Sequence, residues 1–253
     1  MMKGLSEIEQ KKVNNIFFVL CGFFITNAII AEILGTKIFE INLFLNFNLS
    51  VGVVIWPVVF IGTDIINEYF GKEGVKKISF FTVILIFYVF IVIFIATNLK
   101  PANFWLEVNK IDSAGNDFNI NYAYNSIFIQ SSGIIIGSII AFLVAQILDV
   151  HVFQKIKKIT GEKFIWLRAT GSTLISQFID SFLILFIAFY LLTPEDKSWS
   201  LNEVFLVGKD NYLFKFMVAI LITPLIYLGH FIIDKYLGKS LAKKCKDYAS
   251  STS

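Results

Sequence analysis

Acidic side chains inside apolar segments are the first feature of this sequence that could do chemistry. Asp64 and Glu68 are four residues apart and would share one face of a helix, and Asp180 lies in the middle of a later apolar segment. An ionisable group within a membrane costs roughly 2.5–3.5 kcal/mol, so such groups usually face a bundle interior or a watery cavity. We therefore predict that these three acids belong to a buried polar site, although Glu68 could instead pair with Lys72 one turn further along.

Polar residues near these acids complete the predicted site. Arg168 is the only arginine among the 22 Lys and Arg residues, and its rigid fork of donors is one that Lys cannot imitate. Ser172, Ser176 and Asp180 recur every four residues, so one side of their segment is a polar stripe. A solvated position at the membrane interface is the alternative for Glu32 and for Arg168. The predicted substrate-binding residues are Asn27, Glu32, Trp56, Asp64, Asn67, Glu68, Arg168, Ser176, Gln177 and Asp180.

Signatures of enzymatic chemistry are absent from the sequence. Its only histidines are His151 and His230, and it contains no HExxH motif, P-loop or dinucleotide fingerprint. Cys21 and Cys245 provide neither a disulfide framework nor a CxxC metal site. We therefore expect no catalytic activity, no metal and no cofactor. The carboxylates, amides and aromatic residues indicate a binding cavity for a small, polar, planar solute.

The composition places these residues in a membrane protein. Of the 253 residues, 56% are hydrophobic and 16% charged, whereas soluble domains are about half apolar and a quarter charged. The mean hydropathy is +0.72. Only four prolines occur, which favours long apolar helices over short strands with frequent turns. The sequence therefore predicts an all-α polytopic membrane protein that forms a single transmembrane domain over residues 1–253.

Six segments are long enough to cross a hydrocarbon core, which takes about 20 apolar residues. They are predicted near 14–36, 49–69, 78–98, 126–148, 168–192 and 212–234. Sixteen Lys and Arg residues flank these segments on one side and six on the other. Because cytoplasmic loops carry the positive excess, we expect both termini in the cytoplasm and a multi-pass protein of the inner (plasma) membrane.

Smaller features bear on how the helices pack. Three segments followed by three more would allow a 3+3 inverted repeat, for which residues 60–70 and 174–186 provide only a short echo. Gly133 and Gly137 form a GxxxG motif that predicts a close helix contact. His230 and Asp234 are four residues apart near the end of the last segment. Interfacial anchoring and a proton relay are both open for this pair.

Three segments resemble the queuosine precursor transporter family, also called the vitamin uptake transporter family. They are WPVVFIGTDIINEYFGKEGVKK at 56–77, NAIIAEILGTKIFEI at 27–41 and LRATGSTLISQFIDSFLILFIAF at 167–189. The resemblance covers most of residues 20–195. The residues that occupy motif positions of the family are Asp64, Asn67, Glu68, Arg168, Ser176, Gln177 and Asp180. The segment that holds Glu32 matches more loosely.

The resemblance implies a six-helix inner-membrane importer of 7-deazaguanine bases, which are salvaged for tRNA modification. Such bases include 7-cyano-7-deazaguanine, 7-aminomethyl-7-deazaguanine and queuine. One carboxylate can accept both donors of a guanine-like edge, and the carbonyl oxygen needs a donor such as Gln177 or Asn67. Trp56 could stack on the base, which is worth about 1–3 kcal/mol. The resulting hypothesis is that Asp180 or Asp64 binds the base edge and the other acids hold a substrate side chain or a coupling proton.

Other functions remain open at this point. The main alternative is the substrate-binding subunit of an energy-coupling-factor type vitamin importer, which would require partner ATPases. The missing catalytic motifs disfavour an intramembrane enzyme, and the cost of buried acids disfavours a scaffold without a solute. The expected partners are the lipid bilayer and a nucleobase-like solute, with no nucleic acid. The sequence does not decide between a monomer and a homodimer.

Overall fold

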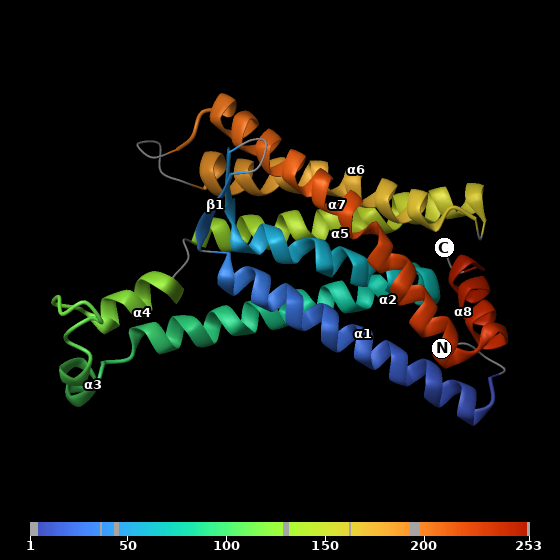
Figure 1. Cartoon of the computed structure of the whole chain (residues 1–253), viewed down its shortest axis with the longest axis horizontal. Coiled ribbons are helices and arrows are strands. Elements are labelled where there is room, and N and C mark those ends of the chain that lie inside the picture. The colour runs from blue at the N-terminus through green and yellow to red at the C-terminus, as the bar shows by residue number, and fades with distance from the viewer. Residues whose placement is uncertain are drawn as a thin grey trace.

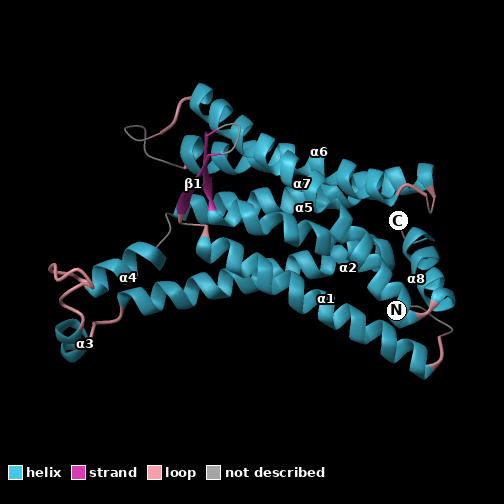
Figure 2. Ribbon diagram, viewed as in Figure 1, coloured by secondary structure: helices cyan, strands magenta, loops and turns pink. Residues whose placement is uncertain are grey.

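Helices form most of the chain in the computed structural model, which describes residues 5–35, 37–42, 46–128, 132–161, 163–192 and 198–251. Within these residues only one two-stranded hairpin interrupts the helical architecture, so the expected all-α class is confirmed (Figure 2). The elements are α1 (Glu7–Leu34), β1 (Ile38–Asn42), β2 (Asn46–Ser50), α2 (Val51–Asn98), α3 (Asn103–Val108), α4 (Ile120–Phe128), α5 (Ser132–Thr160), α6 (Ile165–Leu185), the π-helix η1 (Phe186–Leu191), α7 (Leu201–Leu237) and α8 (Lys239–Ser251).

The longest helix, α2, contains two of the predicted membrane segments. Its backbone leaves helical geometry at Gly71, with φ 68° and ψ −173°, and the chain turns back there (Figure 1). This region of backbone space is essentially restricted to glycine. The first half of α2 (residues 51–70) and its second half (residues 72–98) thus correspond to the predicted segments 49–69 and 78–98.

Five helices are long and apolar enough to cross a membrane: α1, α2, residues 135–160 of α5, α6 together with η1, and α7. The largest difference from the sequence prediction is at α5, which continues to Thr160. The connection expected between the predicted segments 126–148 and 168–192 is therefore helical over most of its length, and the predicted end near residue 148 is wrong. Hydropathy misses this extension because its polar side chains pack against protein rather than lipid. Lys3, Lys197 and residues 129–131 of the predicted 126–148 segment lie outside the described residues.

Serine caps fix where several helices begin. The Ser6 hydroxyl accepts a hydrogen bond from the backbone N–H of Glu9, and the Glu9 carboxylate accepts one from the backbone of Ser6. Ser200 and Glu203 form the same capping box at the start of α7. Such boxes satisfy backbone donors that the first helical turn leaves free. The Ser50 hydroxyl accepts from Gly52 N–H at the start of α2 and donates to Gly35 O, so it also ties α1 to α2.

The two ends of the helix bundle carry different structures. The antiparallel hairpin of β1 and β2, in which Ile38 pairs with Ser50, lies at one end together with α3 and α4 (Figure 1). The turn at Gly71, the end of α5 and α8 lie at the other end. Helix α1 also begins at this second end, next to the start of α8. This placement agrees with an even number of crossings.

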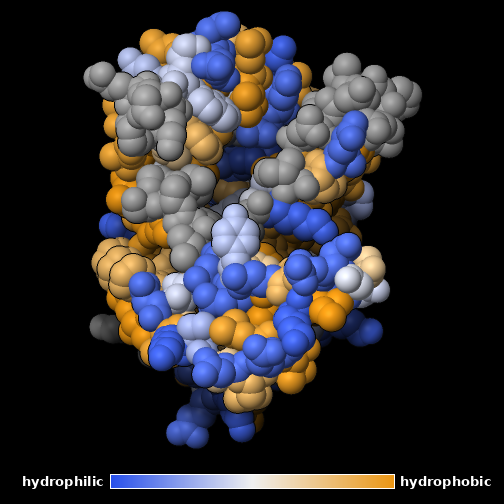
Figure 3. All heavy atoms as spheres, turned by 90° about the vertical axis from the view of Figure 1, so that its left-hand side faces the viewer, coloured by the Kyte–Doolittle hydropathy of each residue, from blue (hydrophilic) through white to orange (hydrophobic). Residues whose placement is uncertain are grey.

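The outer surface of the helices is strongly apolar. Large hydrophobic side chains on several helices are well exposed, including Phe18 (79%), Phe94 (69%) and Leu221 (76%). Viewed from the hairpin end, hydrophobic side chains line the flanks, while hydrophilic ones gather over the lower part, where α3 and α4 lie (Figure 3). Apolar patches of this extent mark a surface that meets a membrane rather than water. The chain is therefore a polytopic helical membrane protein.

Beneath this surface, close packing joins the helices. Phe24 of α1, Val59 and Ile86 of the two halves of α2, and Phe142 of α5 belong to one buried apolar cluster. A Cβ at Gly137 would lie 3.2 Å from Ile184 O, so α5 approaches α6 too closely there for a larger residue. This agrees with the helix contact predicted from the GxxxG motif.

Candidate functional site

Buried polar side chains on the first half of α2, on α5 and on α6 face one another inside the bundle. We call this set the polar cluster, and all of its members are at most 6% exposed. Polar groups are rarely buried without partners, because an unsatisfied group costs free energy. The members are Thr63, Asp64, Asn67 and Glu68 on α2, Gln146, Asp149, Gln154 and Lys157 on α5, and Arg168, Ser172, Thr173, Ser176, Gln177 and Ser181 on α6.

A charged triad closes one side of the polar cluster. Arg168 Nη2 lies 2.7 Å from Glu68 Oε1, and Arg168 Nε lies 3.1 Å from Glu68 Oε2. Lys157 Nζ lies 3.2 Å from Glu68 Oε2, so one carboxylate holds two cations. The two parallel bonds from the guanidinium are the bidentate geometry that Lys cannot provide.

Arg168 also fastens the connection between α5 and α6. Its Nη1 donates to Gly161 O at 2.7 Å and to Lys163 O at 3.2 Å. Its guanidinium carbon lies 5.9 Å from the centre of the Phe153 ring. Every face of the guanidinium is thus engaged within the protein, which explains how a fully buried arginine is tolerated.

Amide and hydroxyl contacts join α2 to α5 further along the cluster. Gln154 Nε2 donates to Asn67 Oδ1 at 2.5 Å. One to two helical turns away, Thr63 Oγ1 lies 3.1 Å from Gln146 Oε1. These contacts hold the polar faces of the two helices in register.

Asp64 and Asp149 are the two acids of the cluster that form no ion pair among the described residues. Asp149 Oδ1 accepts a hydrogen bond from Ser176 Oγ at 3.2 Å. The two aspartates are close enough to interact electrostatically. Several buried atoms of the cluster lack a hydrogen-bond partner among the described residues: Asp64 Oδ1, Asn67 Nδ2, Gln146 Nε2, Asp149 Oδ2, Thr173 Oγ1, Gln177 Nε2 and Ser181 Oγ. Native proteins contain few such atoms, so a group of them in one place marks a candidate position for water, an ion or a polar ligand.

Asp64 and Thr173 line a small cavity at the edge of the polar cluster. Its remaining walls come from α2, α6 and α7, and its volume is about 10 Å³. Ligand pockets for organic molecules usually measure about 300–1,000 Å³. The described conformation is therefore closed around Asp64, and a base-sized solute would need the helices to separate. The other lining residues are Pro57, Phe60, Ile61, Thr170, Ala219, Ile222 and Ile226.

Six of the ten predicted site residues meet in the polar cluster. They are Asp64, Asn67, Glu68, Arg168, Ser176 and Gln177. Glu68 binds Arg168 and Lys157 there, instead of the alternative partner Lys72, which contacts His151. Motif positions from two distant parts of the sequence, on α2 and on α6, are thus brought together in one cluster.

Asp180 and Glu32 lie nearer the hairpin end. Asp180 forms an ion pair with Lys215 of α7, at 2.5 Å between Oδ2 and Nζ. Glu32 is 7% exposed and accepts a hydrogen bond from Ser138 Oγ at 2.9 Å. Glu32 and Asp180 are close enough to interact electrostatically. They form a second, outer polar group rather than part of the polar cluster.

Asn27 and Trp56 are placed apart from both groups. Asn27 Nδ2 donates to Phe23 O within α1 at 2.8 Å. The Trp56 ring lies 5.1 Å from the ring of Phe142 and 6.3 Å from that of Phe60, between centroids. In this conformation Trp56 therefore packs on aromatic neighbours in the apolar cluster.

Sequence reasoning missed the contribution of α5. Asp149, Gln154 and Lys157 were outside the predicted site because the segment was ended near residue 148, and Gln146 lies inside that segment but was not selected. Their spacing of 3, 5 and 3 residues follows one face of a helix, and this periodicity is the signal that could have found them. Lys215, the partner of Asp180, was likewise treated only as a loop charge.

A buried network surrounds His230 at the end of the bundle near α8. Tyr69 OH donates to Asp234 Oδ1 at 2.6 Å and lies 3.1 Å from His230 Nδ1. Lys246 of α8 lies 3.1 Å from Asp234 Oδ2. These contacts tie α2, α7 and α8 together.

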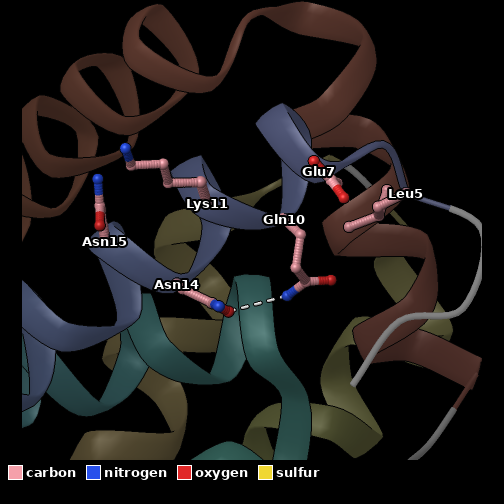
Figure 4. Close-up of a pocket in the computed structure, with 6 residues that line it drawn as sticks. All are labelled: Leu5, Glu7, Gln10, Lys11, Asn14 and Asn15. Atoms are coloured by element: carbon pink, nitrogen blue, oxygen red, sulfur yellow. Dashed lines mark hydrogen bonds between the residues drawn. The ribbon is translucent and has the colours of Figure 1, made fainter.

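Another depression lies on the surface at the start of α1 and is separate from the polar cluster (Figure 4). Its volume is about 500 Å³, and all its lining residues come from residues 5–15. Gln10 Nε2 donates to Asn14 Oδ1 there at 2.8 Å. Because a single helical segment lines it, we regard the polar cluster as the better candidate site. No group of three or more His, Cys, Asp or Glu side chains able to hold a metal ion occurs in the described part of the chain.

The fold and the site together define a multi-pass helical membrane protein with a polar centre built from three helices. The chain belongs to the family described as "Putative vitamin uptake transporter", whose model matches residues 50–229. This range contains α2, α5 and α6, and so every residue of the polar cluster.

Curated relatives from two bacteria each align with 70% of this chain. A probable queuosine precursor transporter of Bacillus subtilis is 29% identical over 182 residues, which is 70% of this chain and 70% of the relative. The queuosine precursor transporter of Escherichia coli is 26% identical over 176 residues, again 70% of each chain. No solved structure matches this chain at a significant level.

Proposed function

We propose that this protein imports queuosine precursors, which are 7-deazaguanine bases, across the inner membrane by a secondary or facilitative mechanism. The observation that carries the proposal is the set of unpartnered donors and acceptors buried in the polar cluster of a vitamin uptake transporter family member. The names of the relatives from Bacillus subtilis and Escherichia coli support the same solute.

The chemistry of the cluster suits a guanine-like edge. Such an edge offers two adjacent donors, which one carboxylate such as Asp64 can accept, and one carbonyl acceptor, which an amide such as Asn67 or Gln177 can serve. Each of these three residues has an unpartnered buried atom, which would meet the base once the helices separate. Asp180 is less suited to reading the base, because Lys215 already holds its carboxylate. We assign Asp180, Glu32 and Lys215 to the outer entrance of the path.

We further propose six membrane crossings with both termini in the cytoplasm. The turn at Gly71 divides α2 into halves of 20 and 27 residues, each long enough to cross. The Lys-rich start of the second half of α2 (residues 72–77), the end of α5 and α8 lie at one end of the bundle, which the positive-inside rule makes the cytoplasmic end. The opposite directions of the first half of α2 and α6 are compatible with an inverted repeat.

Uptake in cells that cannot synthesise the precursors tests the proposed function. Cells expressing the intact chain should restore queuosine in tRNA when labelled 7-cyano-7-deazaguanine is supplied. Asp64→Asn should reduce the initial uptake rate at least about tenfold, since it loses an ionic hydrogen-bond acceptor worth about 1.5–3 kcal/mol. Asp210→Asn is the matched control, because Asp210 is 60% exposed and should leave uptake unchanged. Failure of the intact chain to restore queuosine would refute the assignment.

Purified protein in liposomes separates this proposal from its alternatives. Uptake by the chain alone is expected, whereas a subunit of an energy-coupling-factor importer would need ATPase partners. The solute recovered from the vesicles should be chemically unchanged, whereas an enzyme would convert it into a product.

A further inference from the structure

Asp64 and Asp149 are the charges of the polar cluster that its cations do not neutralise. The cluster contains three acids, Asp64, Glu68 and Asp149, and two cations, Lys157 and Arg168. Both cations contact Glu68 directly. With every group ionised, the cluster would carry one net negative charge, concentrated on the two aspartates.

Burial makes this excess charge costly. An uncompensated ion costs several kcal/mol in a protein interior even after relaxation. Two acids that interact in a buried site usually take up one proton between them, because both cannot ionise together. One proton shared by Asp64 and Asp149 brings the whole cluster to neutrality. We therefore propose that the Asp64 and Asp149 pair is a proton-binding site that couples transport to the proton gradient, an inference that rests on the proposed function.

The groups facing the pair do not supply another positive charge. Besides Asp149, the ionisable groups that interact electrostatically with Asp64 are Glu68 of α2 and Arg168 of α6. Arg168 is bound to Glu68, as is Lys157, the cation of the cluster on α5. The α7 residues that line the cavity beside Asp64 are Ala219, Ile222 and Ile226. Two ionisable residues further along α7 are engaged elsewhere: Lys215 with Asp180 and His230 with Tyr69.

Neutral polar groups around the pair suit a proton rather than a permanent ion. Thr173 Oγ1 is buried, has no partner among the described residues and lines the cavity that contains Asp64. A hydroxyl can both donate to a carboxylate and accept from a carboxylic acid. The cavity of about 10 Å³ is close to the smallest that holds one water molecule, so a proton can be exchanged there without a large opening.

The two aspartates have different surroundings, which assigns them different roles. Ser176 donates to Asp149 Oδ1, and Asp149 Oδ2 is without a partner among the described residues. When the two donors of the base bind the Asp64 carboxylate, the shared proton resides on Asp149 Oδ2. Base and proton then cross together, and both leave on the cytoplasmic side. No covalent bond changes, and one proton moves inward with each base.

Liposomes containing the intact chain test this coupling with labelled 7-cyano-7-deazaguanine. With the membrane potential clamped, an exterior one pH unit more acidic should accumulate the neutral base about tenfold, as one proton per base requires. Adding 7-cyano-7-deazaguanine outside the vesicles should acidify their lumen, which a pH-sensitive dye loaded inside reports. Accumulation driven by a sodium gradient instead, or uptake with no proton movement, would overturn the inference while leaving the proposed function intact. Absence of any uptake would refute both.

Variants locate the proton. Asp149→Asn is permanently neutral, so it should lose the accumulation and the lumen acidification while it still exchanges internal for external base at a measurable rate. Asp210→Asn should retain both. A protein that retains exchange is folded, so loss of coupling in Asp149→Asn cannot come from unfolding. If Asp149→Asn still accumulates base about tenfold, the proton is not held at this pair.

The infrared band of a carboxylic acid provides a second measurement that does not depend on transport. The intact protein should lose one such band as the pH rises, and the band should be missing in the double variant Asp64→Asn with Asp149→Asn. An unchanged band in the double variant would overturn the assignment.

Discussion

Glu68 and Arg168 are joined by two hydrogen bonds, of 2.7 and 3.1 Å, across 100 residues of sequence. Their pairing brings the end of the first half of α2 against the start of α6. Because Lys157 also binds Glu68, the same carboxylate ties α5 to both. The three helices that carry the polar cluster are thus locked together on one side.

Removing the Glu68 charge should destabilise the protein strongly. Glu68→Gln leaves Arg168 and Lys157 buried without a counter-ion, and breaking a buried ion pair costs about 3–5 kcal/mol. We expect the melting temperature of the purified protein in detergent to fall clearly. Glu107→Gln removes an exposed pair with Lys110 and should change stability by at most about 1 kcal/mol. Equal melting temperatures for the two variants would contradict the triad.

The ion pair of Asp180 and Lys215 should show strong coupling in a double-mutant cycle. Asp180→Asn and Lys215→Met each leave one charge unpaired, whereas the double variant leaves none. The loss of unfolding free energy in the double variant should therefore be about 0.5–3 kcal/mol smaller than the summed losses of the two single variants. The exposed neighbours Lys209 and Asp210, 3.8 Å apart, provide a matched cycle whose coupling should lie below about 1 kcal/mol. Additive effects at Asp180 and Lys215 would argue against their pairing.

The turn within α2 should depend on glycine at position 71. At φ 68° and ψ −173°, a side chain costs about 1–3 kcal/mol, so Gly71→Ala should lower the unfolding free energy by that amount. Gly22→Ala is the opposite case, because that glycine is helical and has open space where a Cβ would be. It should stabilise the protein by roughly 0.5–1 kcal/mol. Thermal unfolding of the two variants checks the contrast, and equal effects would rule out the backbone conformation at Gly71.

The thiol of Cys245 on α8 should react slowly at neutral pH. Burial raises the pKa of Cys245 to about 11, because it disfavours the thiolate, which is the reactive form. In a Cys21→Ser background, alkylation should therefore accelerate as the pH rises toward that value, and after denaturation it should be fast at neutral pH. The raised pKa also stabilises the folded protein below the ordinary thiol pKa, and this contribution is lost as the pH rises toward about 11.

A cysteine at position 247 provides the control for Cys245. Asp247 is exposed on the same helix, so Asp247→Cys in a chain lacking both native cysteines should be alkylated rapidly without denaturation. Similar rates at the two positions in the folded protein would show that α8 does not pack against the bundle as described.

The sequence predicted the helices better than their contacts. The membrane segments follow from runs of apolar residues, and Asp64 and Arg168 stand out because ionisable groups are costly in such runs. The segment around Gln146 and Asp149 shows the limit of this reasoning. Hydropathy ends that segment near residue 148, while the helix continues because its polar face packs against Asn67 and Glu68.

The sequence alone predicted a helical membrane protein, several of the residues that carry its buried polarity, and the family that its motifs resemble. These properties depend on composition and on spacing along one helix. The pairing of the polar groups became visible only in the folded structure: Glu68 with Arg168, Asp180 with Lys215, and Asp149 with Ser176. Such pairs depend on how separate helices rotate and pack, and the periodicity of one segment contains no information about the face that another segment presents to it.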